Sequence, residues 1–121
     1  MTDSSTVSQW VERYVRAWNS NNPADIGALF ADDAAYYTGP FDAPWTGREA
    51  IVRGWLGRQD APGNTTFRYE VLATTPDSGI IRGWTQYREP PREYSNIWLM
   101  RFAADGRCRE FTEWWVQRRT A

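Results

Sequence analysis

The sequence contains no histidine, no lysine and only one cysteine in 121 residues. Without histidine the chain lacks the side chain that titrates near neutral pH and that most often ligates metals. Without lysine it lacks an amine for Schiff-base chemistry, and Cys108 has no histidine to activate its thiol. Carboxylates, tyrosines and arginines are the groups left for chemistry, and we expect neither a bound metal nor a cofactor.

The chain also lacks an excess of charge of either sign and long apolar runs. Its fourteen cations, all arginines, are balanced by fifteen acidic residues, so no basic surface favours nucleic acid or an anionic membrane. No apolar run is long enough to span a bilayer. The first eight residues show neither the basic nor the apolar stretch of a secretory signal. With one cysteine and no internal disulfide, we expect a cytoplasmic protein.

Aromatic side chains are abundant, with eight tryptophans, six tyrosines and five phenylalanines. These rings supply bulky apolar surface for a core or for the walls of a pocket. The length is typical of one compact unit. We therefore predict a single domain over residues 1–121, with a small molecule as its most plausible partner.

A long amphipathic helix is expected first. Apolar side chains in residues 7–18 recur at the spacing of one helical face, and Thr6 with Gln9 fits a capping box at its start. Asn22 as the N-cap and Pro23 as the first helical position then indicate a short second helix.

A third helix and then a series of strands follow. Thr46 and Glu49 fit another capping box, and apolar side chains in residues 51–56 continue that helix. Alternation with period two indicates strands in the remainder of the chain. Strands are expected at residues 34–38, 67–71, 80–88, 94–103 and 107–118. Helices first and an antiparallel meander afterwards make an α+β domain, with the helices on one face of the sheet.

The turns decide which strand residues share a face. A hairpin at Asp105-Gly106 places Trp98 opposite Glu113 and Asn96 opposite Trp115. Either turn available to residues 76–79 places Phe67, Tyr69 and Val71 beside Arg82, Trp84 and Gln86. The face turned toward the helices is therefore expected to carry aromatic side chains and four polar residues: Arg82, Gln86, Asn96 and Glu113.

The opposite face of the last two strands is apolar as well. Soluble chains rarely expose a patch of this kind, and helices can cover only one face of a sheet. We therefore predict that the second face is buried in a homodimer. The residues of this face are Ile97, Leu99, Thr112, Trp114 and Val116, together with Cys108.

Four segments of the chain resemble the nuclear transport factor 2-like superfamily, and within it the SnoaL-like group. These segments are residues 10–18, 25–34, 46–51 and 102–115. The resemblance implies a cone of curved antiparallel sheet closed by three N-terminal helices around a pocket. It leaves the activity open, because that fold carries isomerases, cyclases, epoxide hydrolases, dehydratases and binding proteins.

The first third of the chain has a distant similarity to ketosteroid isomerase. By that resemblance, the oxyanion-hole tyrosine of the family falls on Tyr14. Its general-base aspartate falls on Thr38, and its protonated aspartate falls on Trp98. Two of the three catalytic groups are therefore replaced, and we do not expect ketosteroid isomerase activity.

Glu113 is the first candidate for a catalytic group. Among aromatic neighbours its carboxylate is expected to be poorly solvated, which raises a pKa toward the range useful for a general base or acid. Tyr14 would donate its hydroxyl to a developing oxyanion. Arg82 would hold a substrate carboxylate or would pair with Glu113. The expected substrate-binding residues are Trp18, Tyr36, Thr38, Trp55, Trp84, Asn96, Trp98 and Trp115.

Two functions remain open from the sequence. In the first, the chain is a cofactor-free isomerase, cyclase or dehydratase that moves a proton on an apolar cyclic substrate. In the second, it is a non-catalytic domain that binds a hydrophobic ligand or serves as a dimeric scaffold. In that case Glu113 and Arg82 neutralise each other, and Tyr14 is a core side chain.

Overall fold

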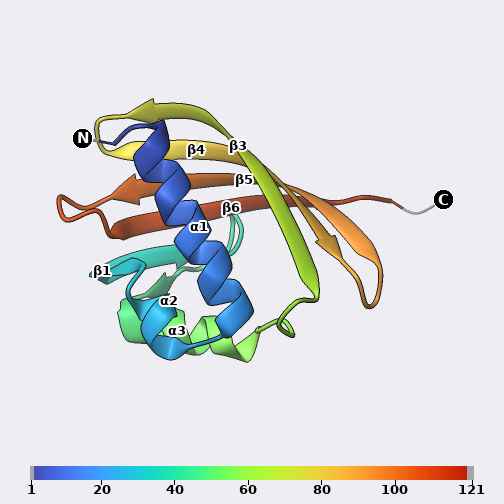
Figure 1. Cartoon of the computed structure of the whole chain (residues 1–121). Helices are drawn as coiled ribbons and strands as arrows, with labels where there is room; N and C mark the ends of the chain where they lie inside the picture. The colour runs from blue at the N-terminus through green and yellow to red at the C-terminus, as the bar shows by residue number, and fades with distance from the viewer. Residues whose placement is uncertain (1, 120–121) are drawn as a thin grey trace.

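The computed structural model describes residues 2–119, which form three helices and one six-stranded sheet (Figure 1). The helices are α1 (Ser4–Ser20), α2 (Pro23–Gly27) and α3 (Arg48–Gly57). The strands are β1 (Phe30–Tyr37), β2 (Trp45–Thr46), β3 (Thr65–Thr75), β4 (Ser78–Tyr87), β5 (Arg92–Phe102) and β6 (Cys108–Gln117). Their order in the sheet is β2-β1-β6-β5-β4-β3, and the neighbours are antiparallel except for β1 and β6. The predicted α+β class is confirmed.

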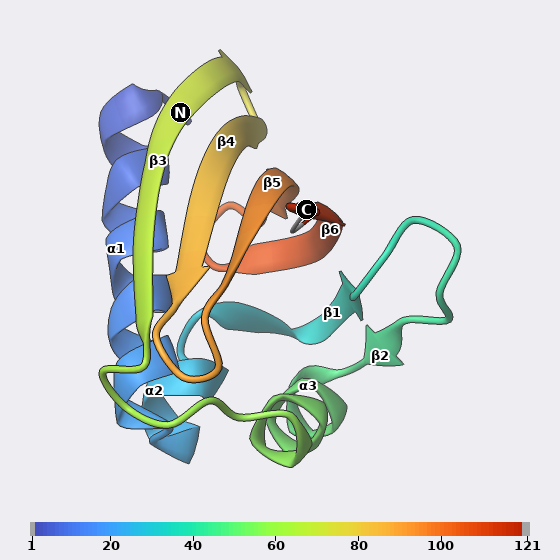
Figure 2. The ribbon, with the colours of Figure 1, turned by 90° about the vertical axis from the view of Figure 1, so that its right-hand side faces the viewer.

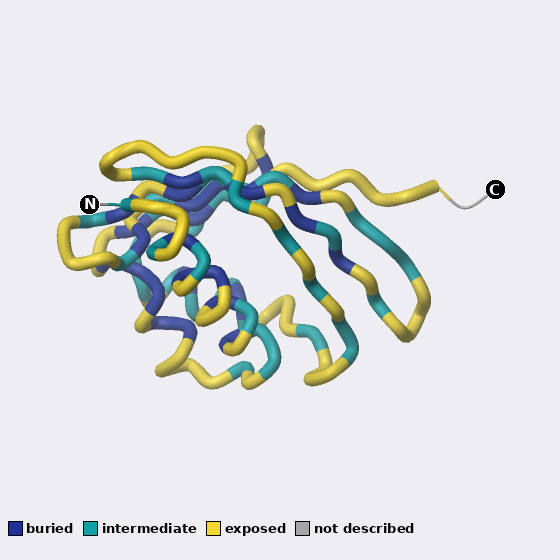
Figure 3. The backbone as a smooth tube through the Cα atoms, turned by 45° about the horizontal axis from the view of Figure 1, so that its top comes forward, coloured by how far each residue is buried: buried dark blue, intermediate teal, exposed yellow. Residues whose placement is uncertain are grey.

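The sheet is strongly curved, and the helices lie inside the curve (Figure 2). α1 crosses the concave face beside β3, while α2 and α3 lie near β1 and β2. The buried segments concentrate where α1 meets the middle of the sheet, and the hairpin tips are exposed (Figure 3). None of the helices within residues 2–119 is both long and apolar enough to cross a bilayer.

Of the three predicted helix N-caps, only that of α2 is confirmed. Asn22 caps α2 as predicted, and its side chain accepts a hydrogen bond from the Ala24 amide. α1 begins earlier than predicted, because Asp3 caps it and accepts from the amide of Thr6 at 2.8 Å. α3 has Gly47 as its N-cap, with φ at +91° and no side-chain cap. The capping boxes predicted at Thr6 and Thr46 are therefore wrong.

The predicted pairing of β5 with β6 is confirmed. Trp98 lies opposite Glu113, and Asn96 lies opposite Trp115. All four side chains belong to the concave face, where they line a cavity with residues of α1 and α3. The last hairpin therefore delivers the candidate carboxylate to the inside of the fold.

Cys108, at the start of β6, was predicted on the convex face of the sheet, and this prediction is wrong. A bulge near the turn shifts the register between Arg101 and Phe102, so that Phe102 pairs with Cys108. Cys108 is consequently buried in the core instead of lying on the convex face. Burial raises the pKa of its thiol to about 12, which keeps the thiol protonated and poorly nucleophilic at neutral pH.

The predicted faces of β4 are wrong, although its turn falls within the predicted residues. Thr75 pairs with Ser78 across the turn. Between Val71 and Ala73, however, a bulge adds one residue to β3. The pairs on the side of the bulge away from the turn are therefore shifted by one residue. Phe67, Tyr69 and Val71 therefore pair with Thr85, Gly83 and Ile81. Because a shift of one residue exchanges the faces of a strand, Arg82, Trp84 and Gln86 lie on the convex side.

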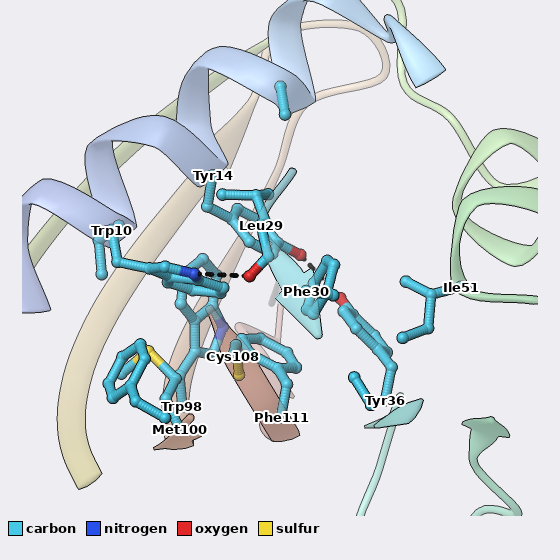
Figure 4. Close-up of a cluster of buried hydrophobic side chains, with 14 of the residues drawn as sticks. Trp10, Tyr14, Leu29, Phe30, Tyr36, Ile51, Trp98, Met100, Cys108 and Phe111 are labelled. Atoms are coloured by element: carbon cyan, nitrogen blue, oxygen red, sulfur yellow. Dashed lines mark hydrogen bonds between the residues drawn. The ribbon is translucent and has the colours of Figure 1, made fainter. Parts of the chain in front are cut away.

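The core joins α1 to the sheet through aromatic rings (Figure 4). Trp10 packs its ring edge-on against Phe30 and Phe102 and donates its indole N–H to the Leu29 carbonyl at 3.0 Å. Phe111 of β6 is fully buried at the centre of this cluster. These contacts explain why the tryptophan-rich face of the first helix needs a concave sheet to cover it.

Replacement of Gly83 by alanine is expected to destabilise the fold by about 1–3 kcal/mol, because overpacking displaces neighbouring groups. A Cβ atom at Gly83 would clash with the ring of Phe67, which is stacked on Trp98 at 4.9 Å. Urea unfolding followed by fluorescence measures the change. Gly57→Ala is the matched control, since nothing lies near its Cβ position. Equal stability of the two variants would contradict the packing argument.

Candidate active site

A cavity of about 350 Å³ opens between α1, α3 and the concave face of the sheet. Nine of its fifteen lining residues are aromatic, and the rest are polar or charged. The lining residues are Tyr14, Trp18, Tyr36, Thr38, Trp45, Trp55, Arg58, Asp60, Thr85, Tyr87, Tyr94, Asn96, Trp98, Glu113 and Trp115. Aromatic walls with a few placed polar groups are typical of small-molecule sites.

Most of the predicted site residues meet in this cavity. Two of the three catalytic candidates, Glu113 and Tyr14, line it. So do seven of the predicted substrate-binding residues: Trp18, Tyr36, Thr38, Trp55, Asn96, Trp98 and Trp115. Trp115 remains 54% exposed, which places it at the open side of the cavity.

Arg82 and Trp84 do not reach the cavity, contrary to prediction. The Arg82 guanidinium forms an exposed ion pair with Glu70 at 2.7 Å on the convex face. Trp84 lies on the same face under the guanidinium groups of Arg68 and Arg82, at 4.3 and 4.9 Å from its ring centroid. The bulge in β3 is the cause. The suggested pairing of Arg82 with Glu113 is therefore wrong.

The carboxylate of Glu113 is held on one side by neutral donors. Its Oε2 accepts from the Asn96 amide at 2.8 Å and from the Trp98 indole N–H at 2.9 Å. The Thr85 hydroxyl donates to Asn96 Oδ1 at 2.8 Å, which orients the amide so that its NH₂ group faces Glu113. Within residues 2–119 no group donates to Oε1. One carboxylate oxygen is therefore left for a ligand.

Burial raises the pKa of Glu113, and the hydrogen bonds from Trp98 and Asn96 oppose part of that rise. The physical cause is the loss of water around a charge, which favours the protonated form. A carboxylate with a raised pKa is a stronger base than an exposed one, and its acid form exists closer to neutral pH. Glu113 therefore has the environment of a proton-transfer group.

Two tyrosines from different elements meet in the cavity (Figure 4). The hydroxyls of Tyr14, on α1, and Tyr36, on β1, lie 2.7 Å apart. Both rings stack on Phe111, at 5.6 and 4.5 Å between centroids. Only one of the two hydroxyl hydrogens is used in their mutual bond. Because no other described group accepts from either hydroxyl, the second hydrogen is available to a ligand.

The two hydroxyls remain protonated over the whole working range of a protein. Burial raises the pKa of Tyr14 and of Tyr36, and the nearby charge of Glu113 raises both further. Such groups act as hydrogen-bond donors rather than as bases. The pair therefore has the chemistry of an oxyanion-binding site. Its hydrogen bond stabilises the negative charge that forms on a ligand oxygen during reaction.

Asp60, in the loop between α3 and β3, was not identified from the sequence. Its Oδ2 accepts from the Trp18 indole N–H at 2.8 Å and from the Tyr87 hydroxyl at 3.2 Å. Its main-chain carbonyl accepts from Asn21 at 2.9 Å. Burial, with the charge of Asp60, raises the pKa of Tyr87 to about 12. Asp60 thus ties the end of α1 to β4 at the cavity wall.

Arg58 is the second charged residue missed by the sequence analysis. It is the C-cap residue of α3, and its side chain is exposed at the cavity. Hydrophobic periodicity does not mark residues at a helix end or in a loop. No sequence pattern therefore identified Arg58 or Asp60 as a cavity residue. Nowhere in residues 2–119 do three or more potential metal ligands of the His, Cys, Asp or Glu type converge.

Comparison with known proteins identifies similar folds. Residues 11–111 match a family model described as a SnoaL-like domain. A ketosteroid isomerase-like protein from Erwinia carotovora atroseptica SCRI1043 is 18% identical, with a TM-score of 0.70 over 93% of this chain and 95% of that one. A candidate ketosteroid isomerase from Kribbella flavida DSM 17836 is 20% identical, with a TM-score of 0.71 over 100% of this chain and 85% of that one.

No curated protein matches the chain. At these identities the two solved structures establish likeness of fold, and the chemistry has to be argued from the side chains in the cavity. Those side chains differ from the ketosteroid isomerase pattern at two positions. Thr38 and Trp98 stand where the resemblance would place aspartates, and Trp98 instead donates to Glu113.

Proposed function

The chain belongs to the SnoaL-like domain family, and from that membership and its cavity we propose that it moves a proton on a compact apolar carbonyl compound. Glu113 is the base, and the Tyr14–Tyr36 pair is the donor to the oxyanion. The supporting observation is that both groups line one aromatic cavity, each with one position left unused.

The proposed reaction needs only the groups of the chain. In a carbonyl compound with a C=C bond one carbon further on, Glu113 removes a proton from the carbon between the carbonyl and that double bond. The C–H electron pair forms a new C=C bond to the carbonyl carbon, and the π pair of the carbonyl moves onto its oxygen. A tyrosine hydroxyl donates to the resulting oxyanion, which stabilises the enolate. Protonated Glu113 then returns the proton to the far carbon of the original double bond, the carbonyl re-forms, and the C=C bond that remains is conjugated with it. The net change is an isomerisation without oxidation or reduction.

The size of the cavity limits the ligand. A volume of about 350 Å³ lies at the lower end of the roughly 300–1,000 Å³ found for small-molecule sites. Indole and phenol rings on most walls favour a flat apolar body. We therefore expect a molecule of one or two rings with a carbonyl group.

Proton exchange in deuterated buffer tests this proposal. Compact cyclic ketones and enones are incubated with the protein, and loss of the α-hydrogen signal is followed by NMR. We expect exchange above the buffer rate that disappears in Glu113→Gln. Arg82→Gln is the control, because Arg82 lies on the convex face. Exchange that continues unchanged in Glu113→Gln would overturn the role of this residue.

A non-catalytic binding function is the second candidate. The observation that favours it is the replacement of two expected carboxylates by Thr38 and Trp98, which leaves Glu113 as the one cavity carboxylate whose pKa is raised by burial. Under this proposal a ligand raises the melting temperature and is recovered unchanged. Native mass spectrometry of freshly purified protein would detect a retained ligand.

We also propose that a second copy of the chain covers the convex face of β5 and β6. Trp114 and Val116 are 41% and 69% exposed there, while Ile97 and Leu99 are half-buried. Thr112 is already buried within one chain and adds little. A specific interface of this kind needs about 1,200 Å² of total buried area or more.

Trp114→Glu is expected to convert this dimer into a monomer, because a carboxylate would be buried without a partner. Light scattering after size exclusion measures the mass, which should fall from twice 14.0 kDa to 14.0 kDa. Arg118→Glu, beyond the end of β6, is the control. A wild-type mass of 14.0 kDa at micromolar concentration would contradict the proposed dimer.

A further inference from the structure

Arg58 is the one cationic side chain among the residues that line the cavity. It follows α3 directly, and its main-chain N–H bonds to the carbonyl of Trp55, a residue of the cavity wall. Within residues 2–119 its guanidinium has neither an ion pair nor a hydrogen bond. The cavity therefore contains five N–H donors and a positive charge that the described chain does not use.

The acidic residue nearest to Arg58 in the sequence accepts hydrogen bonds from other side chains. Asp60 lines the same cavity, but its Oδ2 accepts from Trp18 and from Tyr87, and it forms no ion pair with Arg58 in the described part of the chain. Neutral donors thus satisfy the carboxylate and leave the guanidinium without its obvious partner.

Several arginines outside the cavity have carboxylate partners. Arg82, Arg109 and Arg118 each form an ion pair with a nearby carboxylate. Exposed Arg53 also lacks an ion pair within residues 2–119, so the feature that distinguishes Arg58 is its position at the cavity. Its charge also reaches the proposed active site, since it lowers the pKa of both Glu113 and Tyr36 against the effect of burial.

We propose that the ligand of this cavity carries a carboxylate, which pairs with Arg58 while the ring of the ligand lies between the aromatic walls. This proposal rests on the proposed function for the position of the carbonyl group, and it narrows the substrate class to compact cyclic oxo acids. A planar guanidinium matches a carboxylate with two parallel N–H···O bonds. The remainder of the ligand is apolar, as the cavity walls require.

The role of Arg58 as a helix cap is the alternative explanation. A cation at the C-terminus of a helix interacts favourably with the last carbonyl groups. This effect would stabilise α3 slightly but would not make ligand affinity depend on a ligand charge. Binding of matched charged and neutral probes therefore separates the two explanations.

Tryptophan fluorescence titration with benzoate and benzamide provides this comparison, because the two probes share shape and differ in charge. We expect the wild type to bind benzoate at least about tenfold more tightly than benzamide, in line with a charge-assisted hydrogen-bonded pair. The preference should weaken as salt concentration increases. Arg58→Gln should remove the preference by weakening benzoate alone, and Arg58→Lys should restore part of it.

Arg53→Gln is the matched control. Arg53 is an exposed residue of the same helix and does not line the cavity, so this variant should keep the full preference. Equal binding of the two probes by the wild type, tighter binding of benzylammonium than of benzoate, or no benzoate binding at millimolar concentration would each overturn the proposal. A preference that survives in Arg58→Gln would do the same.

The same titrations separate this inference from the proposed function. If benzoate is preferred through Arg58 but no oxo acid exchanges its α-hydrogen, the ligand class stands and the proton-transfer role fails. If neutral ketones exchange and benzoate shows no preference, the proton-transfer role stands and the ligand class fails.

Discussion

Glu113→Gln is expected to lower the rate of proton exchange by a factor of about 10² to 10⁴, the usual contribution of a general acid or base. The amide oxygen of glutamine can still accept from Trp98 and Asn96, as Oε2 of Glu113 does. The cavity should therefore keep its shape while it loses its base. Ligand affinity measured by fluorescence should change much less than the exchange rate.

The pH dependence of the wild type provides an independent check. Because the raised pKa of Glu113 means that it ionises above the usual range, the exchange rate should increase with pH through that raised value and then level off. An exposed carboxylate would level off near its unperturbed pKa of about 4.3. A rate that already levels off near that unperturbed pKa would show that Glu113 is not the group that titrates.

Stability should respond to the same group with a defined sign. A carboxylate with a raised pKa binds its proton more tightly in the folded state, so it destabilises the fold as pH increases from the unfolded value through the folded one. Glu113→Gln removes this cost. The melting temperature of Glu113→Gln relative to that of the wild type should therefore increase as pH rises from the unfolded-state to the folded-state pKa of Glu113. The surface carboxylates with lowered pKa values are common to both proteins, and their effects cancel in the difference.

Removal of both tyrosine hydroxyls is expected to produce the second large effect. In Tyr14→Phe or Tyr36→Phe one hydroxyl remains and, freed from its partner at 2.7 Å, can still donate to a ligand. We expect each single variant to lose about tenfold or less. The double variant has no donor and should lose about 10² to 10³, the cost of removing an oxyanion donor.

A loss in the double variant that exceeds the product of the two single losses would identify the pair as one functional unit. Tyr37→Phe is the control, because Tyr37 neighbours Tyr36 on β1 but does not line the cavity. Rates are measured by the same α-hydrogen exchange, with circular dichroism to confirm folding. Single and double variants with equal rates would show that the hydroxyls serve packing alone.

Much of the site could be predicted because β5 and β6 are neighbours in the chain. Their turn residues and alternation place Asn96, Trp98 and Glu113 on one face, and the structure confirms this register. The helical period likewise identifies Tyr14 on the inner face of α1. In each case the information is local, because a period or a turn acts over a few residues.

The error at Arg82 shows where local information ends. The turn at Thr75–Ser78 agrees with the prediction, yet the bulge at Leu72 inserts one residue and exchanges the faces of β4. Gly83 and Phe67 then meet on the concave side, and Arg82 pairs with Glu70 outside. A bulge bends a strand and increases its local twist, and no residue type in β3 marks its position.

Periodicity and turn chemistry, which are local, predicted the three helices, the meander from β3 to β6 and the carboxylate on the inner face of the last hairpin. The tertiary structure alone decided which charges share the cavity with that carboxylate. It excluded Arg82 and brought in Arg58 and Asp60 from a helix end and a loop. These positions depend on the curvature of the sheet and on contacts between segments far apart in the chain, which local patterns do not encode.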